Sequence, residues 1–253
     1  MYPDDSAPLS PATGGQYSCP VTILDERPID ATATTDRDPV REALLASLPD
    51  CRPQTIQRLI DAVRVRRVGP GDRIYTQGDP VPLTVILEGY GAARRTTIGG
   101  KELVSGVAPA GVLFGWSGLA SVPSSVELVA LTECRVAQWP GPLIRTLATS
   151  DPALGLAAID SMAWSLHQTV ERIEGFLHQD ARLRVVRVLA QYRELFFSEN
   201  PVLTRAHLPG LVGTTREMTG KVLRQLERDG TLARVDRNGL KLLRPEQLTL
   251  EPL

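Results

Sequence analysis

The sequence is poor in cysteine and lacks long apolar runs. Its 253 residues contain three cysteines, at positions 19, 51 and 134. An odd number of widely spaced thiols is a poor disulfide framework and is typical of a reducing compartment. No run of about 18 apolar residues occurs, so we expect no transmembrane helix. The first residues lack a basic segment followed by an apolar one, so we expect no signal peptide and predict a cytoplasmic protein.

Motifs that carry enzymatic chemistry are also missing. The sequence has no His/Cys cluster with metal-ligand spacing and no Gly-x-Ser-x-Gly. Its glycines fall in turn patterns and not in a phosphate-binding loop. The sequence therefore does not predict an enzyme.

Charge is almost balanced over the whole chain but unevenly distributed along it. The formal net charge is −1. Between Leu203 and Arg244 there are nine Arg or Lys residues against four Asp or Glu residues. Between Met1 and Val40 there are two Arg residues against seven acidic ones. This asymmetry predicts a basic C-terminal module preceded by an acidic tail.

The first 150 residues divide into a tail and a β-rich domain. Residues 1–40 combine six prolines with acidic and small polar residues, and we predict a disordered tail. Short helices are expected at 40–48 and 53–63. From residue 65 to 139, short Val-, Ile- and Leu-rich runs alternate with glycine turns. Residues 41–150 are therefore predicted to form an antiparallel sandwich or barrel, which we expect to be a sensor domain.

Residues 151–180 are predicted to form one long helix, which begins at Asp151-Pro152. Apolar residues recur along it at alternating spacings of three and four, which is typical of a coiled-coil seam between two parallel copies. An amphipathic helix packed on its own domain would show similar spacing and is the alternative. The predicted dimer seam consists of Leu156, Ile159, Ala163, Leu166, Val170, Ile173 and Leu177.

Residues 181–253 are predicted to form a winged helix-turn-helix. Thr204 is expected to cap a short first helix, Gly213 to supply the tight turn, and Thr214 or Thr215 to cap the second helix. Two strand-like runs joined by Asn238-Gly239 follow as a hairpin wing.

The second of these helices has two predicted faces. A buried stripe is expected from Met218, Val222, Leu223 and Leu226, which leaves Thr215, Arg216, Thr219 and Lys221 exposed. Arginine can bond guanine twice and Glu217 can accept a bond from cytosine, while threonine hydroxyls and a helix N-terminus suit phosphates. A helical hairpin with a solvated charged face is the alternative.

At these residues the sequence resembles the CRP/FNR superfamily of transcription regulators, over roughly residues 45–245. Residues 203–227 carry the most specific likeness, and Ile74–Asp79 and Val85–Gly89 are similar to the opening strands of the family's β-roll. The resemblance implies an α+β fold with an N-terminal jelly-roll-like β-roll, a dimerisation helix and a winged helix-turn-helix. The resulting DNA-binding set is Thr204, Arg205, Thr214, Thr215, Arg216, Glu217, Thr219 and Lys221.

The sequence departs from the cyclic AMP-binding members at their phosphate-binding cassette. The glutamate expected there is replaced by Trp116 or Ser117, and the arginine by Ser124. A buried phosphate without that arginine has no evident partner, so we predict an effector other than cyclic AMP. A small apolar effector near Trp116 is one hypothesis, and core packing of this tryptophan, as of Trp139, is the alternative. The pocket would be formed by Gly115, Trp116, Ser117, Ser124 and Ser125.

Other cofactors of the family also fit poorly. A four-cysteine iron–sulfur cluster cannot be built, because only Cys19 lies near the N-terminus. His167 and His178 occupy equivalent flanking positions on the long helix, and either solvated histidines or a haem or pH-sensing role fits them. Cys134 is expected to be a buried apolar residue, whereas Cys19 could be a reactive thiol.

The predicted function is that of a homodimeric transcription regulator that reads an inverted-repeat operator. Its partners would be double-stranded DNA and a second copy of the chain, with RNA polymerase as a further candidate and no membrane. The alternative is a small-molecule, redox or haem sensor module whose helix-turn-helix mediates protein contacts. The effector, the target genes and the sign of regulation do not follow from the sequence.

Overall fold

The structure is a computed structural model that describes residues 37–100, 102–236 and 238–248. The predicted tail up to residue 36, including Cys19, lies outside the described residues. Helix α1 (Arg37–Ser47) begins three residues before the predicted start. The boundary of the tail at residue 40 is therefore too late, because Val40 is fully buried in the core.

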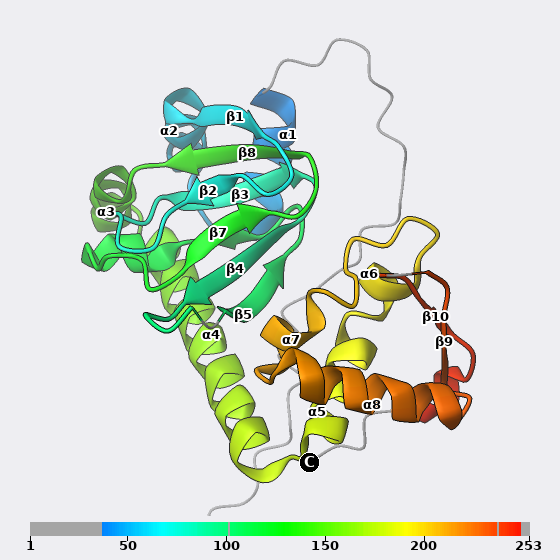
Figure 1. Cartoon of the computed structure of the whole chain (residues 1–253). Helices are drawn as coiled ribbons and strands as arrows, with labels where there is room; N and C mark the ends of the chain where they lie inside the picture. Colours follow the sequence, from blue (N-terminus) through cyan, green and yellow to red (C-terminus); the bar gives the residue numbers. More distant parts are fainter. Residues whose placement is uncertain (1–36, 101, 237, 249–253) are drawn as a thin grey trace, which may run out of the picture. The chain divides into compact units, whose positions relative to one another are not determined.

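Two four-stranded antiparallel sheets form the predicted β-roll (Figure 1). One sheet has the order β1-β8-β3-β6 and the other the order β2-β7-β4-β5. Val68, Ile74, Ile86, Leu128 and Val136 pack together as an apolar cluster contributed by both sheets. The strands are β1 (Arg64–Val68), β2 (Arg73–Tyr75), β3 (Leu83–Glu88), β4 (Gly91–Thr96), β5 (Glu102–Ala108), β6 (Leu113–Phe114), β7 (Glu127–Ala130) and β8 (Cys134–Trp139).

A second apolar cluster lies between the sheet β1-β8-β3-β6 and helices that come before and after its strands in the sequence. It contains residues from α1, α2 (Pro53–Ala62), α3 (Gly141–Ser150) and the first turns of α4 (Pro152–His178). Trp139 is fully buried there, and its indole Nε1 donates to the carbonyl of Leu59 over 2.7 Å. Helix α3 was not predicted, because its ten residues follow strand β8 with only Pro140 between the two elements.

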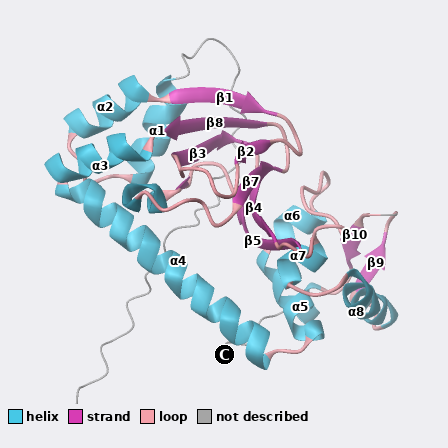
Figure 2. Cartoon of the chain, turned by 60° about the vertical axis from the view of Figure 1, so that its left-hand side comes forward, coloured by secondary structure: helices cyan, strands magenta, loops and turns pink. Residues whose placement is uncertain are grey.

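Helix α4 begins where the sequence predicts and leaves the core after two turns. The Asp151 carboxylate caps it by accepting from the backbone N–H of Ala153, and a hydrogen bond from Thr55 lowers the pKa of Asp151. Leu154 and Ala158 are buried, and α4 then continues as one unbroken helix beyond α3 (Figure 2).

The C-terminal part forms its own apolar cluster, to which Ala92 of β4 and Val104 of β5 also belong. Its elements are α5 (Ala181–Gln191), α6 (Arg193–Phe197), α7 (Leu208–Val212), α8 (Arg216–Arg228), β9 (Leu232–Arg234), β10 (Leu240–Leu242) and a short 3₁₀ helix (Pro245–Leu248). Strands β9 and β10 pair antiparallel, as the predicted wing requires.

Candidate nucleic-acid interface

The turn between α7 and α8 is built around Gly213. Its φ is +67°, which favours glycine, and a Cβ there would lie 2.7 Å from the Phe176 ring. Conformation and space therefore both require glycine, as predicted. The prediction that Thr204 caps the first helix is wrong, because α7 begins at Leu208 after His207. The backbone N–H of Thr204 instead donates to Nδ1 of His207 over 3.0 Å.

The N-terminus of α8 is capped by Thr215. Its Oγ1 accepts a hydrogen bond from the backbone N–H of Met218 over 3.1 Å. The next residues, Arg216 and Glu217, are exposed and lie in the first turn. Backbone N–H groups in the first turn of a helix have no intrahelical partner and suit an anion such as a phosphate.

The buried face of α8 differs from the prediction at two residues. Thr219 is 2% exposed, and its hydroxyl donates to the carbonyl of Thr215, so the prediction that it is exposed is wrong. Met218 is 41% exposed, although the predicted stripe included it. The buried residues 219, 222, 223 and 226 follow the spacing of one helix face, so the pattern alone could have identified Thr219.

The opposite face of α8 is exposed and basic. Glu217 and Lys221 lie on it, and Arg224 and Arg228 continue the stripe at spacings of three and four. These two arginines were not among the predicted DNA-binding residues, although their spacing from Lys221 could have identified them. Among the described residues, Lys221 and Arg224 form no ion pair with a carboxylate. A cationic face of this kind suits a polyanion.

Arg205, which was predicted to contact DNA, already contacts other parts of the protein. Its Nη1 lies 3.7 Å from Oε1 of Glu227, and its backbone N–H donates to the carbonyl of Asn238 in the wing over 3.1 Å. Only 20% of its side chain is exposed. Arg205 therefore connects α8 to the wing, and Thr214 beside the turn is likewise half-buried.

The predicted seam on α4 is an exposed apolar stripe. Leu156, Leu166 and Leu177 are 60%, 66% and 72% exposed. Ile159, Ala163, Val170 and Ile173 are exposed as well. A water-exposed heptad stripe of this length is what two parallel helices bury against each other.

The cassette region of the β-roll is filled by its own side chains. Trp116 is 6% exposed and packs in the same cluster as Leu83 and Ile144. Gly115 has a φ of +91°, and a Cβ there would lie 2.2 Å from the carbonyl oxygen of Pro82. Of the other predicted pocket residues, Ser117 and Ser125 are exposed. The structure thus brings Trp116 into the core and leaves these two serines at the surface.

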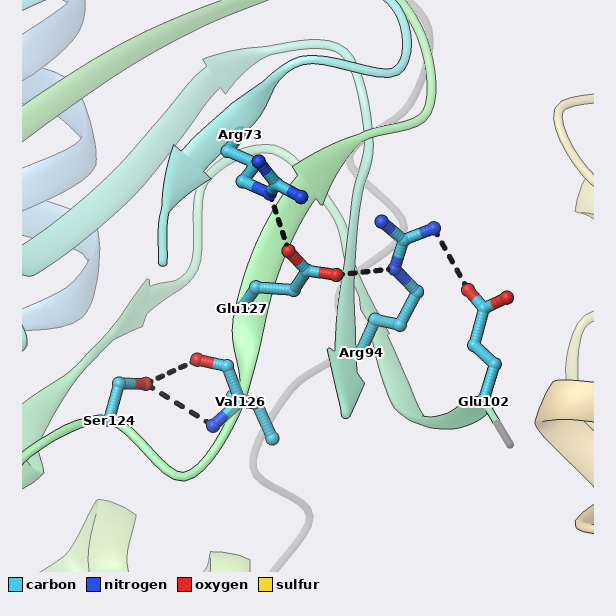
Figure 3. A network of polar contacts seen from close by, with 6 residues as sticks. All are labelled: Arg73, Arg94, Glu102, Ser124, Val126 and Glu127. Atoms are coloured by element: carbon cyan, nitrogen blue, oxygen red, sulfur yellow. Dashed lines mark hydrogen bonds and ion pairs between the residues drawn. The ribbon is translucent and has the colours of Figure 1, made fainter. Parts of the chain in front are cut away.

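Ser124, at the position of the family's arginine, is turned toward its own backbone. Its hydroxyl donates to the carbonyl of Val126 over 2.5 Å (Figure 3). The nearby carboxylate of Glu127 accepts from Arg73 over 2.7 Å and from Arg94 over 2.8 Å. Burial opposes ionisation of Glu127, but these two bonds outweigh it and lower its pKa. Arg94 also pairs with Glu102 over 2.9 Å, so two carboxylates balance the charges of the two arginines.

The histidines of α4 are exposed and separate. His167 lies 3.6 Å from Glu171 and its ring packs near Trp164, whereas His178 ends the helix. Within the described residues no group of three His, Cys, Asp or Glu residues could hold a metal ion. Cys134 is buried, as predicted, and burial raises the pKa of its thiol. No helix in the described part of the chain is long and apolar enough to cross a membrane.

Known proteins match both the sequence and the fold. The family model for the cyclic nucleotide-binding domain matches residues 65–151. The cAMP-activated global transcriptional regulator Vfr of Pseudomonas aeruginosa is 28% identical over 142 residues, which cover 52% of this chain and 66% of Vfr. The match thus spans about two thirds of that relative.

Solved structures share the architecture. The c-di-GMP-responsive global regulator CLP of Xanthomonas campestris is 24% identical with a TM-score of 0.64, over 76% of this chain and 99% of CLP. A CRP/FNR-family protein from Eubacterium rectale is 16% identical with a TM-score of 0.67, over 79% of this chain and 95% of its own. These relatives are described as regulators and not as enzymes. With its β-roll, long helix and winged helix-turn-helix, the chain contains a cyclic nucleotide-binding-type domain and is similar in fold to transcription regulators of the CRP/FNR family.

Proposed function

We propose that this chain is a homodimeric DNA-binding regulator that reads an inverted-repeat operator through α8. The observation that carries the proposal is the exposed basic face of α8, which begins at a threonine-capped N-terminus. A helix of this kind fits the major groove, where its first residues meet base edges. A DNA-binding protein acts where the chromosome lies, so we place it in the cytoplasm.

A two-fold dimer would present α8 twice. The exposed stripe of α4 supports self-association through a second copy. Two recognition helices would then enter successive major grooves about 34 Å apart, so the half-sites should be inverted. The family motif leads us to expect half-sites close to TGTGA, with Arg216 on a guanine and Glu217 on a cytosine. RNA polymerase would be a further partner of such a dimer.

The proposal includes an effector other than cyclic AMP. Trp116 occupies core space at the family's ribose-binding position, and the Ser124 hydroxyl is bonded to its own backbone. A cyclic phosphate at this place would lack the arginine that neutralises it, and burying an unpaired charge is costly. The β-roll thus keeps the fold of a nucleotide-binding domain while its cassette is altered.

The test is DNA binding by fluorescence anisotropy with the variant Arg216→Ala. Loss of a bidentate guanine contact should cost about 1–3 kcal/mol in each half-site, which weakens operator binding by the dimer at least roughly 30-fold and relaxes preference at one base pair of each half-site. Because phosphate contacts release counterions, affinity should also fall steeply between about 50 and 200 mM salt.

Arg58→Ala is the matched control, because Arg58 is an exposed arginine on α2, outside the helix-turn-helix. This variant should bind the operator like the wild type. Equal affinity of Arg216→Ala and the wild type would disprove base reading by Arg216. Binding of the wild type that does not respond to salt would favour a helix-turn-helix that contacts protein.

A further inference from the structure

A cavity of about 290 Å³ lies between α4, α5 and α7. Its wall combines three arginines, Arg172, Arg184 and Arg187, with an apolar side formed by Phe176, Val188 and Leu211. Glu171 is the acidic residue of the wall, and it already interacts with His167 and Gln168 on its own helix. The cavity is therefore cationic on one side and apolar on the other.

Two of the three arginines that line this cavity form hydrogen bonds with other parts of the protein. Nη1 of Arg172 donates to the carbonyl of Val104, and Nη1 of Arg184 donates to the carbonyl of Gln179. Arg187 is half-buried and forms no hydrogen bond or ion pair with a described residue. The donors of the Arg187 guanidinium are therefore available to an anion in the cavity.

Two buried polar atoms at the same cavity also lack partners. Nε of Arg184 and Oε1 of Gln179 are shielded from solvent and form no hydrogen bond. The first needs an acceptor and the second needs a donor. The Arg184 guanidinium lies 5.6 Å from the centre of the Phe176 ring, so an aromatic surface borders the charged groups.

The site remains open in the proposed dimer. Its α4 residues 168, 172 and 175 follow one helix face. Residues 166, 170, 173 and 177 of the seam follow another face, because a step of two residues turns a helix by about 200°. A second copy seated on the seam would therefore leave the cavity uncovered.

We propose that this cavity is a ligand site for a small aromatic anion that also carries an N–H or O–H donor. The anionic group would bind the guanidinium groups of Arg187 and Arg184, the donor would meet the Gln179 side chain, and the ring would lie against Phe176 and Leu211. The ligand would contact the dimerisation helix and the first helix of the helix-turn-helix at once. The site does not depend on DNA binding, so each can fail without the other.

The test compares two dyes that share one aromatic framework. 8-Anilinonaphthalene-1-sulfonate carries a sulfonate and an N–H, whereas N-phenyl-1-naphthylamine lacks the sulfonate. Fluorescence titration of the full chain should show one saturable sulfonate-dye site per chain. Arg187→Gln should weaken that site at least tenfold, Arg187→Lys should restore most of the affinity, and neither should change binding of the neutral dye by more than twofold.

Arg58→Gln is the control for general loss of positive charge and should bind both dyes like the wild type. An unchanged sulfonate affinity in Arg187→Gln would overturn the proposal. An equal loss for both dyes would overturn it as well, because that result would indicate a general change in apolar surface. The far-ultraviolet circular dichroism of each variant shows whether it is folded.

Discussion

Replacement of Leu166 by alanine tests the α4 seam directly. Its side chain is 66% exposed in the single chain, so about two thirds of its surface remains for a partner to cover. Full burial of a leucine side chain is worth about 1.5–3 kcal/mol, so this share is worth about 1–2 kcal/mol per protomer. A symmetric dimer loses it twice, which predicts a dimer dissociation constant raised roughly 30- to 700-fold.

Sedimentation velocity over a range of protein concentrations measures this constant. Leu45→Ala is the matched control, because Leu45 lies on α1 and is 51% exposed. The control should dimerise like the wild type. Circular dichroism of both variants checks that each remains folded, which is expected because neither side chain fills the core.

Two results would contradict the reasoning. If Leu166→Ala and Leu45→Ala had the same dissociation constant, the stripe would not be the contact surface. If the wild-type chain remained monomeric at every concentration, the heptad spacing would have to reflect a helix that stays exposed to water.

Two further predictions concern buried polar groups. Thr219→Val removes one hydroxyl bond and should lower the free energy of unfolding by about 1 kcal/mol while operator affinity stays within twofold; a tenfold loss of affinity would show that this residue meets DNA after all. Glu127→Gln weakens two charged bonds and should cost about 1–3 kcal/mol at neutral pH. Because the folded pKa of Glu127 is lowered, its contribution is present above its unfolded pKa, about 4.5, and is lost as the pH falls through the lower folded value. Urea unfolding at several pH values should therefore show the two proteins converging in acid, and a constant difference would refute the assigned cause.

Long, strongly periodic features could be predicted from the sequence. The start of α4 follows from Asp151 and the proline after it, and the apolar stripe along the helix follows from spacing alone. The turn at Gly213 and the cap at Thr215 were also predictable, because each depends on neighbours in the chain. Local chemistry determines such features before any tertiary contact forms.

Features decided by tertiary packing could not be predicted in the same way. Met218 was assigned to the core by its hydrophobicity, yet the helix face buries Thr219, whose hydroxyl is satisfied within its own helix. Strand β6 has two residues, too few for a period. The cavity wall consists of residues from three helices. Its lining residues lie up to 44 positions apart in the sequence, from Gln168 to Val212, so no local spacing predicts the cavity.

The cassette and the cavity lead to one expectation about where an effector enters. The sequence marks Trp116 as a departure from the family's motif, and the structure places its ring in the core, which was one of the two alternatives for this residue. A ligand in the cassette would have to displace that ring, and loss of a buried tryptophan costs about 3–5 kcal/mol. The cavity between α4, α5 and α7 needs no such displacement, and arginine side chains already line it. A ligand that regulates this protein should therefore bind where α4 meets the helix-turn-helix and not in the β-roll.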